Sequence, residues 1–501
     1  MKSKVAASSV GGNESGKKAT NLGELKASGY VMKTIKEELR ANLIDKLRSK
    51  EKIFRGIIGF DDTVLPDVER AILSRHNILL LGLRGQAKTR IARQMVHLLD
   101  EYIPIVAGSE LNDDPLKPIS RYSLDLIAEH GDKTPITWLH RDERFIEKLA
   151  TPDVSVADLV GDVDPIKAAA LKLPYSDERV IHYGLLPRAN RCIFVINELP
   201  DLQARIQVSL FNALQEGDIQ IRGFKMRLPM DVQFVFTANP EDYTNRGSII
   251  TPLKDRIESQ ILTHYPENVE DSMTITKQEA RLTEDQRKAI TIPDILARLI
   301  EEIAFEARES EYIDESSGVS ARLSISAYEN LVSAAERRMI LSGEKKSTAR
   351  ITDFWGIVPA ITGKVELVYE GEQEGPYEVA MTLMNAAIKK LFLDFFPNPE
   401  KLKKADRDPY GALKAFFADG NTIDLINDDS DKTFRKALES VPGIGKLVDS
   451  IDKIPAEERF TYMELALFGL SETNLLNKEI LNDKFTFQDF LADMLNDLDE
   501  E

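Results

Sequence analysis

The chain has 501 residues, 43% hydrophobic and 30% charged, with a single cysteine and a formal net charge of −18 at pH 7. The acidic balance disfavours a nucleic-acid partner, because proteins that bind phosphate backbones usually carry a basic excess. No apolar run reaches the roughly 18 residues of a membrane span, and Cys192 by itself excludes an internal disulfide or a cysteine zinc cage.

The N-terminal segment, residues 1–28, is rich in Gly, Ser and Lys, and we expect it to be a disordered tail. It lacks the apolar core of a signal peptide, which together with the lone cysteine favours a cytoplasmic location. Beyond the tail, Leu39, Leu43 and Leu47 recur at four-residue steps among charges. This spacing predicts a helix between Tyr30 and Phe54.

The segment NILLLGLRGQAKT, which begins at Asn77, reads as an apolar strand, a glycine loop and the start of a helix. This pattern is typical of a phosphate-binding loop, where the lysine reaches the β- and γ-phosphates and the threonine hydroxyl reaches Mg²⁺. Ala87 replaces the usual glycine before the lysine, and a helix-start residue with negative φ tolerates alanine. The alternative is a chance turn before an exposed Lys-Thr pair. The candidate loop residues are Gly82, Gly85, Gln86, Ala87, Lys88 and Thr89.

Between Ile57 and about Tyr265, short apolar runs alternate with helical segments, which predicts an α/β domain. The expected strands are Asn77–Leu81, Cys192–Ile196 and Gln233–Thr237, and the expected helices include Thr89–Leu99 and Leu202–Glu216. Cys192 begins an apolar run, so we expect a buried, inert thiol.

The second of these strands ends in Asn197-Glu198. In nucleotide hydrolases an acidic pair stands at this place: the first acid holds a Mg²⁺-bound water, and the second polarises the attacking water. Glu198 is a candidate for the second role. Asn197 can accept a hydrogen bond from a metal-bound water but brings no negative charge, so we expect weaker Mg²⁺ binding and slower hydrolysis. The alternative is a strand-to-helix junction with polar caps.

The third strand ends in Asn239, which could orient the attacking water, although Asn-Pro is also a common turn dipeptide. The segment TPLKDRIESQI then presents Asp255-Arg256. A guanidinium here suits the stabilisation of γ-phosphate charge from a neighbouring subunit, whereas an isolated surface pair is the simpler alternative.

From about Asp285 to Leu341 the pattern is helical, and Arg322 stands near a helix start that Ser320 could cap. A lid helix would let Arg322 respond to the nucleotide. Alternation at Val365, Leu367 and Tyr369 predicts a short strand or hairpin. Residues from Ala380 onward read as helices, and the last segment, FQDFLADMLNDLDEE, reads as an amphipathic helix docked on its own domain or, as the alternative, a partner-binding tail.

Taken in this order, the loop and the strand-tip residues resemble the AAA+ ATPases. A narrower similarity, to the magnesium chelatase I-subunit and MoxR branch, rests on three pieces of sequence outside the loop. These are Gly108–Pro115 (GSELNDDP), Leu159–Asp162 (LVGD) and Gly184–Arg191 (GLLPRANR). The Ala-Lys-Thr ending of the loop is more like MoxR proteins.

The resemblance implies an AAA+ P-loop domain with a parallel sheet flanked by helices, a helical lid and a mostly helical C-terminal extension. The implied boundaries are 1–28 (tail), 29–270 (nucleotide-binding domain), 271–345 (lid) and 346–501 (extension, without a recognised family). It further implies ATP and Mg²⁺ as cofactors, with Thr89 and, through water, Asn197 on the metal. Glu198, Asn239 and a trans-acting Arg256 would be the catalytic residues, Arg322 the second sensor, and Ile58 and Gly59 the adenine contacts.

Members of this branch form rings, usually hexamers, and commonly act with a von Willebrand factor A-type partner on a client protein. The expected function is therefore an ATP-hydrolysing, chaperone-like motor that remodels or matures a partner protein or complex. Two alternatives stay open: a nucleotide-gated scaffold with weak hydrolysis because of Asn197, and a magnesium chelatase subunit. A transcriptional activator is disfavoured because the Gly-Ala-Phe-Thr-Gly-Ala loop and a basic helix-turn-helix are absent from the sequence.

Overall fold

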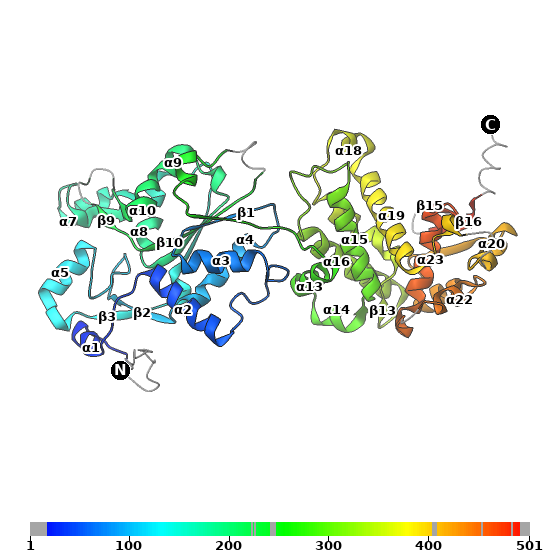
Figure 1. The fold of residues 1–501 in the computed structure, drawn as a ribbon, viewed down its shortest axis with the longest axis horizontal. Helices are drawn as coiled ribbons and strands as arrows, with labels where there is room; N and C mark the ends of the chain where they lie inside the picture. Colours follow the sequence, from blue (N-terminus) through cyan, green and yellow to red (C-terminus); the bar gives the residue numbers. More distant parts are fainter. Residues whose placement is uncertain are drawn as a thin grey trace, which may run out of the picture. The chain divides into compact units, whose positions relative to one another are not determined.

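The computed structural model describes residues 18–221, 224, 227–240, 247–402, 408–451, 454–481 and 484–490. The chain divides into two compact units, each with its own core (Figure 1). The first unit consists of Met1–Gly82 and Ala87–Thr263, and the second of Leu83–Gln86 and His264–Glu501. The tip of the glycine loop is therefore grouped with the second unit, and its flanking residues with the first.

A parallel five-stranded sheet forms the centre of the first unit, in the order β11-β1-β10-β7-β4. The strands are β1 (Ile78–Leu81), β4 (Phe145–Leu149), β7 (Cys192–Asn197), β10 (Val232–Ala238) and β11 (Ser259–Leu262). Three of them confirm the strands expected from the apolar runs. Since the strands are parallel, the carboxyl ends of β1, β7 and β10 meet at one edge, where α/β proteins bind ligands.

Alternate residues of the central strands enter two different hydrophobic clusters, as expected for a sheet covered on both faces. Ile78, Leu80, Val195 and Val235 join one cluster with residues of α2, α3 and α4. Leu79, Leu81, Phe194 and Phe236 join the other, with residues of α8, α9 and α10. Cys192 is fully buried, and burial raises the pKa of its thiol to about 12, as expected for an inert residue.

The other elements of the first unit lie around this sheet, and the first of them differs from expectation. Within the segment expected to be disordered, α1 is helical, because Leu22 and Leu25 are buried and the Leu22 N–H donates to the carbonyl of Thr134; residues 1–17 lie outside the described residues. The helices are α1 (Leu22–Ala27), α2 (Ile35–Ser49), α3 (Val64–Leu73), α4 (Lys88–Gln94), α5 (Arg121–His130), α6 (Val156–Leu159), α7 (Pro165–Leu171), α8 (Leu185–Arg188), α9 (Ala204–Ser209), α10 (Phe211–Gln215) and α12 (Thr251–Lys254). Three antiparallel hairpins are β2 (Tyr102–Val106) with β3 (Ile136–His140), β5 (Gly161–Val163) with β6 (Ile181–Tyr183), and β8 (Asp218–Ile219) with β9 (Leu228–Pro229).

The second unit is mainly helical, with one hydrophobic cluster that runs from Ile290 to Phe487. Its helices are α13 (Val269–Glu279), α14 (Glu284–Ala289), α15 (Asp294–Glu309), α16 (Arg322–Ser342), α17 (Val358–Thr362), α18 (Tyr369–Glu374), α19 (Pro376–Phe395), α20 (Gly411–Ala418), α21 (Asp431–Glu439), α22 (Ile444–Asp449) and α23 (Arg459–Glu472). Its strands are β12 (Ile290–Thr291), β13 (Ser347–Thr348), β14 (Ile423–Ile426), β15 (Leu476–Leu481) and β16 (Lys484–Asp489). Among the described helices, none is long and apolar enough to cross a bilayer.

Two expectations for the C-terminal third are wrong. The alternation at Val365, Leu367 and Tyr369 does not form a strand: Leu367 makes an isolated bridge to Ile313, and α18 begins at Tyr369. Phe487, expected on a helix, lies in β16 between β14 and β15, where it is fully buried. Here cross-strand burial of alternate apolar residues outweighs the local helical spacing. Residues 491–501 lie outside the described residues.

Candidate nucleotide-binding site

Lys88, the first residue of α4, is buried at the carboxyl edge of the sheet. Its ammonium donates to the carbonyl of Gly82 and, at 2.7 Å, to Oδ1 of Asn239. The parallel register explains the second contact, because Leu81 of β1 lies opposite Ala238 of β10 and Asn239 follows directly. The structure thus brings together the loop lysine and the strand-tip asparagine that the sequence places about 150 residues apart.

The backbone of Ala87 differs from the sequence expectation. Its φ is +53°, in the left-handed region, whereas the expected φ of this residue was negative. A left-handed alanine costs roughly 1 kcal/mol relative to glycine, so the loop stores strain where the lysine enters the helix. Gly85 is also left-handed, with φ +75°, and within the second unit a Cβ at this position would collide with the Ser320 hydroxyl.

Asn197 at the end of β7 is the centre of a second group. Its Oδ1 accepts from the hydroxyl of Thr89 at 3.2 Å and from that of Thr237 at 3.0 Å. The hydroxyl of Thr237 also accepts from the backbone N–H of Glu198 at 3.2 Å. The two residues predicted on the metal side, Thr89 and Asn197, are therefore in direct contact.

Glu147, which was not expected from the sequence, lies on β4 beside Asn197. Its Oε1 accepts from Nδ2 of Asn197 at 2.6 Å. The same carboxylate forms a two-bond ion pair with Arg93 of α4, at 2.9 and 3.0 Å. No motif marks Glu147, since it stands in the middle of a strand about 50 residues upstream, and only the pairing of β4 with β7 brings it to the site.

Glu198 follows Asn197 in a left-handed conformation, with φ +54°, and is partly exposed. A left-handed non-glycine residue at a strand tip is strained, and such strain concentrates at functional sites. The geometry lets Glu198 turn sharply out of β7 while Asn197 stays buried.

Arg256 lies apart from this group. Its Nε donates to the side chain of Gln215 at 3.0 Å, its Nη1 donates to the carbonyl of Pro252 at 2.7 Å, and its guanidinium stacks over Phe211 at 4.8 Å. Within the described residues it makes no hydrogen bond or ion pair to the loop or to the strand tips, a placement compatible with action on another subunit.

Arg322 is exposed at the start of α16 in the second unit, and its guanidinium makes no hydrogen bond or ion pair within the part of the chain that the structure describes. Its backbone N–H donates to the hydroxyl of Ser320 at 3.2 Å, although the cap position itself is held by Ala321. Ile58 and Gly59 lie on the loop before α3, between the buried Ile57 and Phe60.

The sequence pieces that suggested the chelatase and MoxR branch form a bonded cluster. Arg191 pairs with Asp114 at 3.1 Å, and both side chains are buried. Asn190 donates to the carbonyl of Leu111 at 2.8 Å, and Asn112 donates back to the carbonyl of Asn190 at 3.1 Å. These residues fasten the loop after β2 to the start of β7, so their role is structural.

Two glycines of the same pieces are required by close packing. Gly161 has φ +114°, and a Cβ there would collide with the backbone of His182; a Cβ on Gly184 would lie 2.6 Å from the carbonyl oxygen of Leu159. The hairpin β5–β6 that they permit borders an open hollow of about 570 Å³. Charged residues of both signs line it, including Asp162, Asp164, His182 and Arg188.

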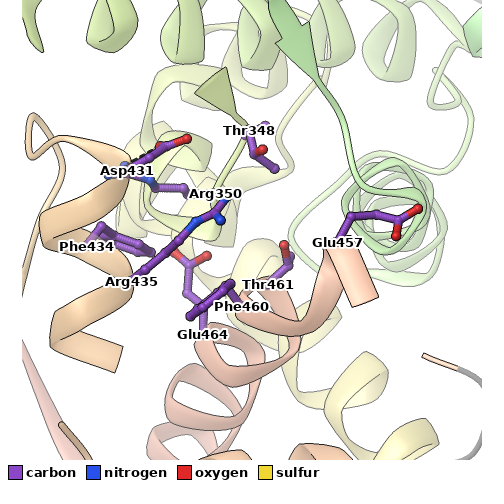
Figure 2. Close-up of a pocket in the computed structure, with 10 residues that line it drawn as sticks. Thr348, Arg350, Asp431, Phe434, Arg435, Glu457, Phe460, Thr461 and Glu464 are labelled. Carbon is purple, nitrogen blue, oxygen red and sulfur yellow. Dashed lines mark hydrogen bonds and ion pairs between the residues drawn. The ribbon is translucent and has the colours of Figure 1, made fainter. Parts of the chain in front are cut away.

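A cavity in the second unit is too small for a ligand. Its volume of about 20 Å³ holds about one water molecule. Figure 2 shows Arg350, Asp431, Phe434 and Glu464 around it. Arg350 pairs with Asp431 at 2.6 Å and stacks over Phe434 at 4.0 Å, so these groups already bind one another.

The donor set at the sheet edge fits Mg²⁺, which prefers oxygen ligands and keeps several of its waters. Thr89 Oγ1 lies 3.2 Å from Asn197 Oδ1, and the carboxylate of Glu147 accepts a hydrogen bond from the amide nitrogen of Asn197 at 2.6 Å. Among the described residues, no cluster of three or more His, Cys, Asp or Glu could hold a metal by itself.

One known protein family matches the part of the chain that contains β7 and β10. The family model of the sigma-54 interaction domain matches residues 174–261. An archaeal Lon protease from Halobacterium salinarum is 27% identical over 164 residues, which amount to 30% of this chain and 23% of that protein. The chain therefore matches less than a quarter of that relative's length.

The solved structures to which the chain is similar include a BchI–BchD complex of magnesium chelatase, with 20% identity over 64% of this chain and 98% of that chain (TM-score 0.32). NtrX from Brucella abortus in complex with ATP has 14% identity over 58% of this chain and 53% of that chain (TM-score 0.33). These scores are low and carry no argument by themselves. The family match covers β7 and β10, whose ends bear Asn197, Glu198 and Asn239. Over residues 174–261 the chain is therefore similar to the sigma-54 interaction domain.

Proposed function

We propose that this chain binds ATP with Mg²⁺ and hydrolyses it. The observation that carries the proposal is the contact network at the carboxyl edge of the sheet, where Lys88 meets Asn239 and Thr89 meets Asn197. In a nucleotide complex Lys88 would exchange these contacts for the β- and γ-phosphates. Bound Mg²⁺ would neutralise charge on the phosphate oxygens during transfer.

Each predicted residue has a role in this proposal. Gly85, Gln86 and Ala87 would direct backbone N–H groups at phosphate oxygens. The N–H of Gly82 donates to the carbonyl of Ala238 at 3.2 Å, so Gly82 would serve as the turn from β1 into the loop. Glu198 would polarise the attacking water and Asn239 would orient it. Arg256, from a neighbouring subunit, would stabilise charge on the γ-phosphate. The adenine contacts are Ile58 and Gly59, and the lid sensor is Arg322.

We further propose that the chain works as a homo-oligomeric ring, with a hexamer as the expected size, and remodels or matures a partner protein or complex in the cytoplasm. The bonded cluster of Arg191, Asp114 and Asn190, built from sequence pieces that resemble the chelatase and MoxR branch, supports this assignment. The proposed functional segments are 29–270 for nucleotide binding, 271–345 for the lid and 346–501 for an extension. A von Willebrand factor A-type protein is the expected partner.

Steady-state ATPase assays test the proposal. Purified protein should show Mg²⁺-dependent phosphate release that Lys88→Ala abolishes. Thermal unfolding of the variant, measured beside that of the wild type, separates loss of nucleotide binding from loss of the fold. Wild-type turnover no greater than that of Lys88→Ala would overturn the proposal of hydrolysis.

A nucleotide-gated scaffold is the second candidate, favoured by the amide at Asn197. This protein would assemble with ATP but barely hydrolyse it. Sedimentation with and without ATP, measured beside turnover, separates the two: ATP-dependent assembly with turnover equal to that of Glu198→Gln supports the scaffold. Turnover well above that of Glu198→Gln supports the motor.

A further inference from the structure

Glu147 completes the metal side of the nucleotide site, and this inference rests on the proposed ATPase function. We propose that Glu147 is a positioning residue that acts through Asn197. It orients the Asn197 amide and supplies the negative charge that the amide lacks. In nucleotide hydrolases the first acid of the strand-tip pair holds a Mg²⁺-bound water. Here Glu147 and Asn197 would do this together.

The carboxylate decides which way the amide faces. An ionised carboxylate can only accept hydrogen bonds, and an amide NH₂ can only donate them. The Asn197 amide must therefore present its Nδ2, not its Oδ1, to the carboxylate, and Nδ2 lies 2.6 Å from Oε1 of Glu147. Its Oδ1 then faces the hydroxyl of Thr89 at 3.2 Å, on the side where the metal-bound waters would lie.

Strand pairing makes this arrangement rigid. In the parallel pair of β4 with β7, Glu147 is opposite Val195 and Leu149 is opposite Asn197. Because side chains alternate with a period of two, Glu147 and Asn197 point to the same face of the sheet. That face is covered by α4, which supplies both Thr89 and the partner of Glu147, Arg93.

The charges also fit. The Glu147 side chain is only 25% exposed, whereas Arg93 is 63% exposed. The carboxylate is in direct contact with the Asn197 amide and Arg93 binds that carboxylate, so negative charge lies next to the amide. Outer partners of metal ligands typically change metal affinity by about 10- to 100-fold when they are removed.

This arrangement reverses the simplest expectation for Asn197→Asp. An aspartate there would place two carboxylates about 2.6 Å apart. Like charges this close repel, so the two carboxylates would move apart and the contact between positions 147 and 197 would be lost. The acid should therefore improve the site only if Glu147 becomes Gln at the same time, so that an amide again faces a carboxylate.

Four variants test the proposal: Glu147→Gln, Asn197→Asp, the double variant, and Arg93→Gln. Glu143→Gln is the matched control, because it removes one exposed carboxylate just before β4. The first readout is Mn²⁺ affinity, by electron paramagnetic resonance, in the presence of a non-hydrolysable ATP analogue. The second is the Mg²⁺ dependence of turnover, and thermal unfolding checks the fold of each variant.

We expect Glu147→Gln to weaken Mn²⁺ binding about 10-fold or more, and the double variant to recover most of the loss. Asn197→Asp alone should not improve affinity. Arg93→Gln should weaken binding less than Glu147→Gln, because it leaves the carboxylate beside the amide. Wild-type affinity in Glu147→Gln, no recovery in the double variant, or equal losses in Arg93→Gln and Glu147→Gln would each overturn the proposal.

The metal readout separates this inference from the proposed function. A wild type that binds Mn²⁺ with the analogue but releases no phosphate would refute hydrolysis, and the affinities of the variants would still decide the role of Glu147. Failure of the wild type to bind metal and nucleotide at all would refute both.

Discussion

The ammonium of Lys88, at the start of α4, lies 2.7 Å from Oδ1 of Asn239, which follows β10, the strand paired with β1 in the parallel sheet. Both side chains are buried. The loop that would hold phosphate and the strand tip that would orient water are therefore in contact before any ligand binds. A nucleotide must displace this contact, so the two residues should affect binding and turnover differently.

Asn239→Ala should lower turnover at least about 10-fold, as expected for loss of a water-positioning group, with a smaller change in nucleotide affinity. Lys88→Ala should weaken nucleotide binding itself, because its charge would contact the phosphates. Fluorescent-nucleotide titration and phosphate release measure the two effects. Equal losses of affinity in both variants would contradict the division of roles.

Arg256 should act across a subunit interface. Lys88→Ala and Arg256→Ala proteins should each be inactive alone, because each lacks one half of every site. Mixing them should restore part of the turnover, since some interfaces then join an intact loop with an intact arginine. Activity of Arg256→Ala by itself, or no recovery on mixing under conditions where wild-type subunits exchange, would place the arginine outside the reaction.

Ala87→Gly should stabilise the protein by up to about 1 kcal/mol, because glycine adopts the left-handed conformation without strain. The φ of +53° makes this site different from an ordinary alanine. Ala169→Gly, in an exposed part of α7, is the matched control and should instead destabilise by about 0.5–1 kcal/mol. Urea unfolding measures both, and a loss of stability in Ala87→Gly comparable to that of the control would contradict the strain.

Glu464 should make the stability of the second unit depend on pH. Burial raises the pKa of this carboxyl to about 7. The backbone N–H groups of Ile351 and Thr352 donate to it at 2.9 and 2.8 Å and lower the pKa, but burial is the larger effect. The folded state therefore holds its proton more tightly than the unfolded state, whose pKa is about 4.3. The contribution of Glu464 to stability should fall as the pH rises between these values and level off above about pH 7.

Thermal unfolding between pH 4 and pH 8 checks this dependence, with Glu464→Gln as the comparison. The neutral amide cannot titrate, so the variant should lose that part of the pH dependence. It also gives up one of the two acceptor oxygens, and its stability should be lower at pH 5. Parallel pH profiles for the two proteins would show that Glu464 does not titrate in this range.

Glu38→Ala should strongly destabilise the first unit. Glu38 of α2 pairs with Arg144 through two hydrogen bonds of 2.7 Å, and both side chains are almost fully buried. Removing one partner leaves a buried charge, which typically costs about 3–5 kcal/mol. Urea unfolding measures this loss. The control is Glu284→Ala, which breaks the exposed pair with Lys288 and should cost less than about 1 kcal/mol.

The sequence alone predicts the features that depend on residues close together in the chain. Apolar runs ending in Gly82, Asn197 and Asn239 predicted three strands of the central sheet, because a parallel strand covered on both faces is mostly apolar. The glycine loop and Lys88 are predicted as a phosphate site from short-range spacing. The helical character of α15 and α16 followed from the 3.6-residue period.

Only the tertiary structure decided the rest. Glu147 reaches Asn197 because β4 pairs with β7, and no local pattern reports which strands become neighbours. The left-handed φ of Ala87 is imposed by the turn from the loop into α4. Phe487 lies in a strand because a sheet buries it on both sides of β16. In each case a long-range contact outweighs a local preference worth less than about 1 kcal/mol per residue.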